Sequence, residues 1–452
     1  MFKEISPLDG RYYDRLSHLG NYFSEFALMR SRVLVELRFL LALDESGLFE
    51  KFTSEEIDKI QFYLDNFSEA DYQRIKEIEK TTNHDVKSCE IFLQEELDLK
   101  HPNMIHFGLT SEDVNNLAYT FLFKDYLEKE QLPQIETVLK ILIEHAANWK
   151  DVPFPARTHG QMASPSTGGK EMAVFLIRLI RQYERLKSFS FLGKLNGATG
   201  NYSALKAAFP KYDWIAFSEK FMEKYGLKIN SATTQIEDHD TWAEYFSITK
   251  RINNIILDMD RDIWLYLTLG YLTISADKGA VGSSTMPHKV NPINFENSEG
   301  NMQVSIALFN GLIDKLGNSR LQRDLSDSTV TRNVGVALAH SYLAIQETTK
   351  GLKKLSINNV RCEYELKTHP ELLAEPIQTI LRREGLENPY NLLKDLTRGQ
   401  DISEDDLGKF IDQLDIEDRV KKELKSLSVL DYLGEAKKIT EQAINKAKGK
   451  LK

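Results

Sequence analysis

The stretch GSSTMPHKVNPINFENSEGN, residues 282–301, brings together residue types that can bind and stabilise negative charge. Ser283 and Ser284 follow a glycine, so their backbone N–H groups have little steric cover. Lys289 and Asn291 add a cation and an amide. Because fixed donors stabilise a charged transition state without reorganising, the stretch is suited to a carboxylate or a developing carbanion. A flexible surface hairpin is the alternative that its glycines and prolines allow.

Polar residues also gather in three other segments that lack helical periodicity. They are TTNHD (81–85), PFPARTHGQMASPST (153–167) and TTQIEDHD (233–240). His159 lies in a turn-forming context, and an imidazole with a pKa of about 6.5 is a natural proton carrier if it faces a cleft. An exposed loop histidine is the alternative. His84 has the same two interpretations, since the neighbouring Asp85 can fix its tautomer or only cap a helix.

The elements that must position these segments have the pattern of long helices. Apolar residues recur at spacings of three and four between Trp242 and Tyr266, at Tyr245, Ile248, Ile252, Ile255 and Met259. Similar stripes run through residues 112–148, 170–190, 299–316 and 333–355. Such stripes are typical of helices packed lengthwise, so the middle of the chain predicts a bundle of about five long helices. The stripes themselves indicate a hydrophobic core and no chemistry.

Composition supports an all-α fold with more than one domain. The chain has 452 residues, more than one hydrophobic core usually serves, with 42% hydrophobic and 28% charged residues. Only 24 glycines and 12 prolines occur, which favours helices over many short strands. Short charged helical patterns replace the long stripes after about residue 360. We therefore expect an N-terminal helical domain with active-site loops (1–111), a central long-helix bundle domain carrying the 282–301 stretch (112–358) and a small helical domain (359–452).

Charge and cysteine content narrow the classes of partner. The net charge is −9, from 58 basic and 67 acidic residues, which argues against a nucleic-acid partner but allows arginines to hold a small anion locally. The apolar run from Trp264 is too short to span a bilayer, and the N-terminus lacks the apolar core of a secretory signal. We expect a cytoplasmic protein without membrane contact. Cys89 and Cys362 lie far apart without metal-ligand spacing, which predicts free thiols and no bound metal.

The motif GSSTMPHKVNPINFE closely resembles the G-S-S-x-M-P-x-K-x-N signature of the fumarase/aspartase superfamily. Within it, the chain resembles the long bacterial form of the adenylosuccinate lyases from about Ser6 to the C-terminal region. The matching segments are SPLDGRYYDRL, KTTNHDVK, HFGLTSEDVNN, ARTHGQMASPST, LNGATGNY, TTQIEDHD and QRDLSDSTVTRN. One departure is Met162, where that form typically has proline; it affects loop stiffness and no reacting group.

The resemblance implies a fold, a reaction and catalytic roles. Members are all-α homotetramers of three-domain subunits with a central long-helix bundle, and they eliminate fumarate from a succinyl compound. Ser283 would be the general base that removes the Cβ proton, on a loop that closes over substrate. His159 would be the general acid for the departing nitrogen, and Glu296 would orient it. The resemblance implies no cofactor and no metal.

The same resemblance distributes the substrate contacts. Phosphate and ribose contacts would be Arg11, Tyr12, Arg323, Ser328 and Arg332. The two succinyl carboxylates would be held by Thr110, Ser111, Lys289 and Asn291, and the purine and succinyl side lined by His84, Asp85 and Gln235. Further substrate-binding candidates in these motifs are Asn83, Ser284, Asn297 and Thr329. For any single arginine, a surface ion pair is the alternative.

The implied substrates are small nucleotides: adenylosuccinate and the succinyl-aminoimidazole-carboxamide ribotide of purine synthesis. The implied assembly is a homotetramer with active sites shared between subunits. An argininosuccinate lyase or fumarase is an alternative, but neither would be expected to carry DGRY and QRDLSDSTVTRN together. A recruited structural protein, comparable to lens crystallins that resemble argininosuccinate lyase, would need none of Ser283, His159, Lys289 and Glu296.

Overall fold

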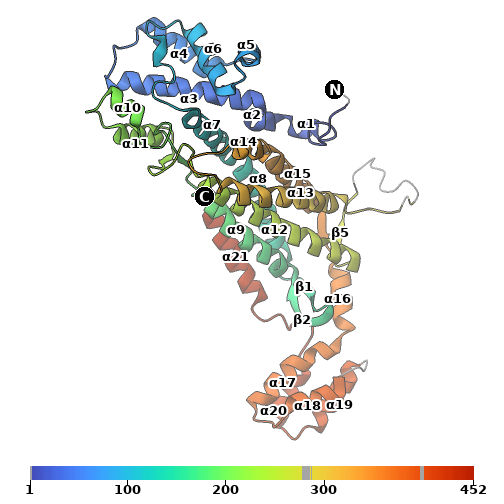
Figure 1. Ribbon diagram of the computed structural model, residues 1–452. Coiled ribbons are helices and arrows are strands. Elements are labelled where there is room, and N and C mark those ends of the chain that lie inside the picture. The colour runs from blue at the N-terminus through green and yellow to red at the C-terminus, as the bar shows by residue number, and fades with distance from the viewer. Residues whose placement is uncertain (1–2, 277–285, 287, 398–401, 452) are drawn as a thin grey trace. The chain divides into compact units, whose positions relative to one another are not determined.

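A computed structural model describes residues 3–276, 286, 288–397 and 402–451, and helices dominate it (Figure 1). The chain divides into two compact units. Unit 1 consists of Met1–Gln134, Tyr183–Asn254 and Gly300–Ala344, and unit 2 of Ile135–Gln182, Ile255–Glu299 and Ile345–Lys452. The division into three domains stays a prediction, since each unit is assembled from separate segments of the chain.

Unit 1 is built mainly from helices of the N-terminal third. Its elements are α1 (Tyr13–Leu16), α2 (Gly20–Phe23), α3 (Glu25–Ser46), α4 (Ser54–Asn66), α5 (Glu69–Thr82), α6 (Asp85–Leu97), α7 (Ser111–Tyr126), β3 (Leu192–Gly193), α10 (Ser203–Ala208), α11 (Trp214–Lys224), β4 (Lys228–Ile229) and α14 (Ser326–Thr331). Capping boxes at Thr53 and Ser68 start α4 and α5. Helix α3 packs along α7, and α5 packs against α6. Strands β3 and β4 form a short parallel pair.

Unit 2 combines two small antiparallel sheets with C-terminal helices. Its elements are β1 (Pro153–Thr158), β2 (Gln161–Thr167), β5 (Leu272–Ile274), β6 (Leu355–Ile357), α16 (Asn359–Lys367), η4 (Pro370–Leu373), α17 (Ala374–Arg383), α18 (Pro389–Thr397), α19 (Glu404–Gln413), α20 (Asp418–Lys425) and α21 (Ala436–Lys450). Strand β1 pairs with β2 and β5 with β6. Short helices after about residue 360 agree with the prediction from the sequence.

The predicted long helices are present, and their residues divide between the two units. They are α8 (Leu132–Trp149), α9 (Gly168–Lys187), α12 (Asp240–Leu269), α13 (Ile293–Leu316) and α15 (Val334–Lys353). The α-helix expected over 112–148 is interrupted, because α7 is followed by a π-helical turn at Leu127–Gln131 before α8 begins. The buried amide of Gln131 in this turn donates to Thr249 Oγ1 at 3.1 Å and accepts from Tyr245 Oη at 2.6 Å.

Three expectations about loops need correction. Residues 153–167 form the hairpin β1–β2, and the TTNHD segment is helical except at Asn83 and His84. Helix α13 begins at Ile293, six residues earlier than the stripe indicated, so the last part of the 282–301 stretch is helical. The carbonyl of Pro292 accepts from the N–H groups of Phe295 and Glu296, which starts this helix directly after a proline.

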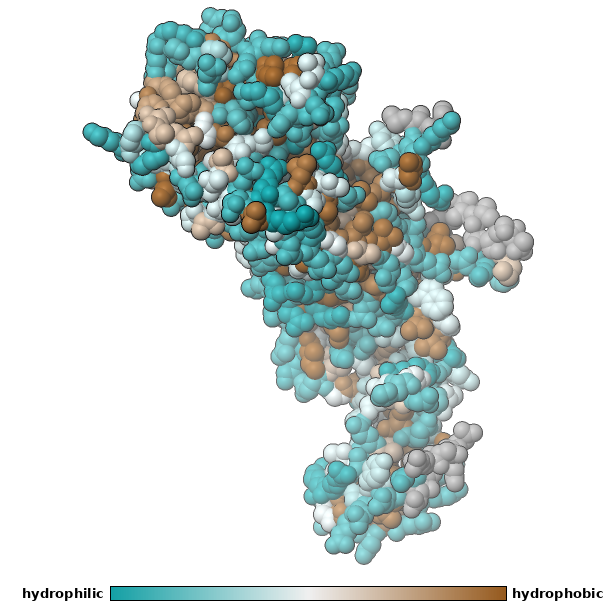
Figure 2. All heavy atoms as spheres, in the orientation of Figure 1, coloured by the Kyte–Doolittle hydropathy of each residue, from teal (hydrophilic) through white to brown (hydrophobic). Residues whose placement is uncertain are grey.

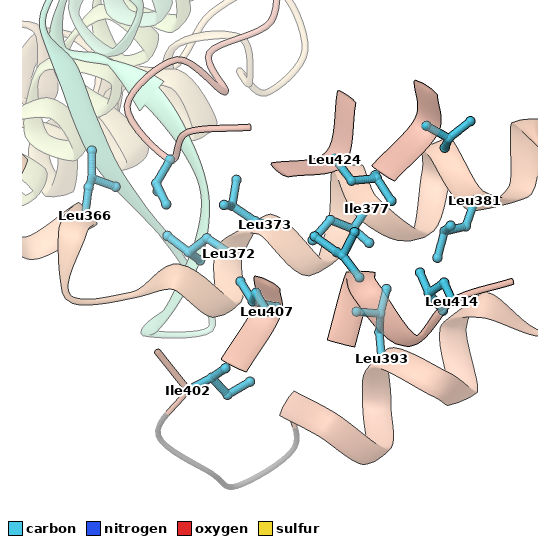
Figure 3. Packing of buried hydrophobic residues seen from close by; sticks show 13 residues of the cluster. Leu366, Leu372, Leu373, Ile377, Leu381, Leu393, Ile402, Leu407, Leu414 and Leu424 are labelled. Atoms are coloured by element: carbon cyan, nitrogen blue, oxygen red, sulfur yellow. The ribbon is translucent and has the colours of Figure 1, made fainter. Parts of the chain in front are cut away.

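The C-terminal helices of unit 2 enclose a hydrophobic cluster of their own (Figure 3). Its buried members include Leu366, Leu372, Leu373, Ile377, Leu381, Leu393, Ile402, Leu407, Leu414 and Leu424. Met162 of β2 packs against this cluster, so the residue that departs from the family pattern is a packing residue of the hairpin. Cys89 and Cys362 are both buried free thiols. Within the described ranges, none of the helices combines the length with the hydrophobicity that a bilayer-spanning segment requires.

Candidate functional site

The predicted site residues are divided between the two units. Unit 1 contains Arg11, Tyr12, Asn83, His84, Asp85, Thr110, Ser111, Gln235, Arg323, Ser328, Thr329 and Arg332. Unit 2 contains His159, Lys289, Asn291, Glu296 and Asn297. Ser283 and Ser284 lie outside the described residues. The predicted phosphate side therefore falls in unit 1, and His159 and Glu296 fall in unit 2.

In unit 1, Asp85 at the start of α6 lies between two arginines. Its Oδ2 is 2.8 Å from Arg32 Nη2 and 3.7 Å from Arg332 Nη2. Burial opposes ionisation, but the charge of Arg32 and hydrogen bonds outweigh it and lower the pKa of the Asp85 carboxyl. Asp85 is therefore an anion beside Arg332, whose side chain is exposed. Arg332 also lines a cavity of about 220 Å³.

The network continues from Arg32 to Arg323. Arg32 Nε donates to Asn115 Oδ1 at 2.9 Å, and Asn115 Nδ2 donates to Glu112 Oε1 at 2.8 Å. Arg323 Nη2 donates to the same Glu112 oxygen at 3.1 Å and Nη1 to Gln235 Oε1 at 3.4 Å. Four predicted residues from three motifs thus belong to one polar network: Asp85, Gln235, Arg323 and Arg332. Such a network restrains the guanidinium groups of Arg32 and Arg323, each of which has more than one polar partner.

Beside Arg323, three side chains that could bind a proton or a metal ion lie close together. Donor atoms of Glu112, His239 and Asp327 lie within 4.8 Å of one another, and all three residues are buried. Burial raises the pKa of Glu112, and it lowers the pKa of His239 to about 4. The imidazole is therefore neutral at pH 7, and its Nδ1 has no hydrogen-bond partner within the described part of the chain. Arg323 Nη2 lies 3.1 Å from Glu112 Oε1, so one carboxylate of this cluster already has a positively charged partner.

The N-terminal end of α7 presents Thr110 and Ser111. The Asp113 carboxylate accepts from the Thr110 N–H at 2.8 Å, closing the first turn. Helix N-termini favour anions, which suits the predicted role of these two residues with a carboxylate. Asp113 also pairs with Lys194 at 2.7 Å, and both side chains are fully buried. The turn is thus held from inside the unit while Thr110 and Ser111 stay half-buried.

The other predicted residues of unit 1 lie at helix ends or within the short helix α14. Asn83 has φ 50° and ends α5, and His84 Nδ1 accepts the Lys87 N–H at 3.2 Å to start α6. His84 is thus a helix cap with an exposed ring. Ser328 and Thr329 lie in α14, and Arg11 and Tyr12 directly precede α1. The contacts that join Asp85, Arg32 and Arg332 include neither Arg11 nor Tyr12.

In unit 2, His159 occupies the tip of the β1–β2 hairpin. His159 and Gly160 have φ values of 53° and 76°, and Thr158 pairs with Gln161 across them. Two successive positive φ angles are typical of a type I′ turn, which tolerates histidine better than β-branched residues. Arg157 Nη1 donates to the Gly160 carbonyl at 3.2 Å, and its Nη2 lies 2.9 Å from Glu365 Oε1. The hairpin therefore holds an exposed imidazole on a braced turn.

Glu296 lies in the first turn of α13 and is exposed. Its Oε1 accepts from Trp264 Nε1 at 3.2 Å. Lys289 is exposed, and Asn291 and Asn297 are half-buried. The neighbouring Asn294 is buried and donates to Glu347 at 2.5 Å, which anchors the start of the helix. Within unit 2, Glu296 does not form a hydrogen bond with His159, although it was predicted to orient this imidazole.

The sequence alone did not reveal the buried residues that hold the predicted substrate-binding residues in place. Glu112, Asp113 and Asn115 belong to the motif HFGLTSEDVNN, so their types and spacing were visible. Lys194 stands in the apolar context FLGKLNG, where a lysine signals a buried partner. Arg32 lies on the buried face of α3 and belongs to none of the motifs identified in the sequence.

Comparison with known proteins defines the class first. A family model described as lyase matches residues 14–305, and one described as adenylosuccinate lyase C-terminal matches residues 319–433. Two similar solved structures have the same fold at 18–19% sequence identity. They are a fumarate lyase from Mesorhizobium sp. BNC1 (TM-score 0.78, covering 96% of this chain and 97% of that chain) and a 3-carboxy-cis,cis-muconate lactonizing enzyme from Pseudomonas putida (TM-score 0.79, covering 98% and 100%). The chain is thus an all-α lyase.

Sequence identity to named enzymes then shows the family. The chain is 46% identical to the adenylosuccinate lyase of Haemophilus influenzae, over 97% of this chain and 98% of that protein. It is 45% identical to the Escherichia coli K12 enzyme, over 96% of each, and 44% to that of Dictyostelium discoideum, over 95% and 96%. The chain belongs to the adenylosuccinate lyase family.

Proposed function

We propose that this enzyme releases fumarate from adenylosuccinate to give AMP, and from the succinyl-aminoimidazole-carboxamide ribotide to give the free carboxamide ribotide. The observation that carries the proposal is the 44–46% identity to adenylosuccinate lyases over nearly the whole chain. The two substrates share phosphate, ribose and succinyl groups and differ in the ring between them. The charged residues identified in the motifs are assigned to the phosphate and the succinyl carboxylates, which both substrates have. One site should therefore serve both substrates.

The proposed chemistry is an anti-elimination. Ser283 takes the Cβ proton of the succinyl group, the electrons of that C–H bond form the C=C bond, and the C–N bond breaks. His159 protonates the departing nitrogen from the opposite face, and Glu296 orients the acid. Lys289 and Asn291 stabilise the carboxylate on which charge accumulates during proton removal. A serine can act as base only if its alkoxide is stabilised by such donors.

At the other end of the substrate, Arg323 and Arg332 are proposed to bind the phosphate. The carboxylates of Glu112 and Asp85 hold these arginines in place, and each guanidinium has donors left beyond its carboxylate contact. Preorganised guanidinium groups lose little conformational entropy when an anion binds. Arg11, Tyr12, Ser328 and Thr329 are proposed as further contacts to phosphate and ribose.

The enzyme is proposed to act as a homotetramer with shared sites. Exposed apolar side chains on unit 2 support an assembly: Val174, Trp264, Leu265, Ile293 and Val360. Apolar residues also interrupt the hydrophilic surface on the visible face in Figure 2. Exposed apolar side chains are typical of protein–protein interfaces where they form one continuous patch. A second subunit would then supply the groups that complete the site around His159.

The function is tested by incubating purified protein with each ribotide and following both products. We expect fumarate and the nucleotide product in equal amounts from both substrates. The kcat/KM values for the two substrates should agree within about tenfold, which corresponds to a difference of about 1.4 kcal/mol in activation free energy. Fumarate release from only one ribotide would show that the ring is read by the site. No fumarate from folded protein with either one would contradict the function itself.

A further inference from the structure

A fully buried ion pair lies behind the predicted carboxylate-binding turn of unit 1. Lys194 Nζ is 2.7 Å from Asp113 Oδ1, and both side chains have 0% exposure. Removing two charges from water is expensive, so such a pair persists only with good geometry and additional hydrogen bonds. Lys194 Nζ also donates to the Gly197 carbonyl at 3.0 Å. Neither residue was assigned a role in catalysis or binding.

Asp113 connects the turn to the loop that follows Lys194. Its Oδ2 accepts the Thr110 N–H at 2.8 Å. Its Oδ1 accepts the N–H groups of Asn196 at 3.0 Å and Gly197 at 3.2 Å, in addition to the ammonium. One carboxylate oxygen of Asp113 therefore accepts from the Thr110 backbone, and the other accepts from the backbone of the 194–200 loop. The carboxylate fixes where the Thr110–Ser111 turn lies relative to the 194–200 loop.

The same loop reaches the segment that carries Gln235. Asn196 Nδ2 donates to Thr233 Oγ1 at 2.8 Å. Gly200 has φ +77°, and a Cβ at this position would clash with the Thr233 carbonyl oxygen. Only glycine permits this approach, so the two backbones touch directly. The loop that begins at Lys194 is therefore bonded through Asp113 to the segment of Thr110, and through Asn196 to the segment of Gln235.

We propose that the Lys194–Asp113 pair is a positioning device that sets the Thr110–Ser111 turn and the Gln235 segment for the succinyl end of the substrate. The inference rests on the proposed function, because that function assigns these groups to the substrate. Both charged groups are buried behind the turn, so they act through the backbone that they hold. An apolar pair of equal volume would leave the backbone N–H groups without acceptors and would not fix the three segments.

The variant Asp113→Asn tests this with little change in volume. Its side chain has one acceptor oxygen, so its NH₂ group must face either the Thr110 N–H or the donors of the 194–200 loop. We expect the KM for adenylosuccinate to rise at least tenfold. The inhibition constant of AMP, which lacks the succinyl group, should change less than threefold. Lys194→Met should show the same split between the two constants.

A matched control separates positioning from general loss of stability. Ile75 of α5 is fully buried in the same unit, on an element other than the three segments, so Ile75→Ala should lower the melting temperature. Assayed well below that temperature, Ile75→Ala should keep the wild-type KM. If Asp113→Asn does not fold, Thr233→Val removes the hydroxyl that bonds Asn196 and leaves the ion pair in place. A smaller rise in KM with unchanged AMP inhibition is then expected.

Two kinetic results would overturn the inference. Equal weakening of adenylosuccinate and AMP would show a merely structural pair, and unchanged constants for both would show that the pair positions nothing. Hydrogen exchange gives a readout independent of turnover. The Thr110 amide should exchange faster in Asp113→Asn than in wild type, and protection left unchanged would contradict the inference. Failure of the wild-type enzyme to release fumarate would instead defeat the proposed function, while the exchange result would still decide whether Asp113 holds the turn.

Discussion

Among single residues, Ser283 and His159 should decide turnover. The base and the acid act in the transition state, so Ser283→Ala and His159→Gln should lower kcat by at least about a hundredfold while KM stays within about threefold. His159→Gln should also remove the limb of the pH–rate profile that the imidazole causes. Steady-state kinetics across pH measures both effects. A rate within about threefold of wild type for either variant would show that its assigned role is wrong.

At this scale, motifs in the sequence indicated some residues of the polar network in unit 1 and missed others. Asp85, Gln235, Arg323 and Arg332 came from motifs with recognisable chemistry, and the structure joins them in one network. Arg32 could not be predicted, because its partner Asp85 is distant in sequence and only the packing of α3 against α6 brings the two together. The roles of Ser283, His159 and Glu296 stay predictions.

At the scale of elements, a buried carboxyl group joins three long helices. Asp260 of α12 accepts from Thr348 Oγ1 of α15 at 2.8 Å, and Thr348 lies 2.8 Å from Ser298 Oγ of α13. Burial raises the pKa of Asp260 to about 8, whereas in the unfolded chain it is about 4. Between about pH 4 and about pH 8, the Asp260 carboxyl is therefore protonated in the folded state and ionised in the unfolded state. The stability that this proton contributes is fully present below about pH 4 and is lost as pH rises through about 8.

We therefore expect Asp260→Asn to gain stability relative to wild type as pH rises from about 5 to about 8, by up to about 1.4 kcal/mol per pH unit. An amide cannot ionise, so the variant lacks the loss that affects the carboxyl. Melting temperatures of both proteins at several pH values measure the difference. Asp258→Asn, which changes an exposed carboxylate on the same helix, should not alter the slope. Parallel curves for Asp260→Asn and wild type would contradict the buried, protonated state.

Elements with a long apolar period were predicted well, and short ones were not. The stripes of α9, α12 and α15 repeat over many turns, so their helices could be read directly from the sequence. The hairpin at 153–167 was interpreted as a loop because its strands are short and contain prolines, and its pairing depends on the turn at His159 and Gly160. The π-helical turn at Leu127–Gln131 leaves the apolar pattern intact, so the pattern could not reveal it.

For the whole molecule, the proposed sharing of sites predicts complementation. If Ser283 and His159 of one site come from different subunits, mixed tetramers of Ser283→Ala and His159→Gln will contain some sites with both residues intact. Dissociating the two inactive variants and reassociating them together should therefore restore part of the activity. Reassociating each variant alone is the control. Inactivity of mixed tetramers, with their composition verified by mass, would contradict shared sites.

The reverse reaction in deuterium oxide tests whether the enzyme performs a single anti-elimination. Fumarate and AMP are incubated with the enzyme, and the adenylosuccinate formed is examined by proton NMR. The proposed mechanism predicts one deuterium at Cβ, delivered to the face opposite the new C–N bond, with a CαH–CβH coupling constant that distinguishes this arrangement. Deuterium on the same face, deuterium at both Cβ positions, or no adenylosuccinate at all would contradict the mechanism.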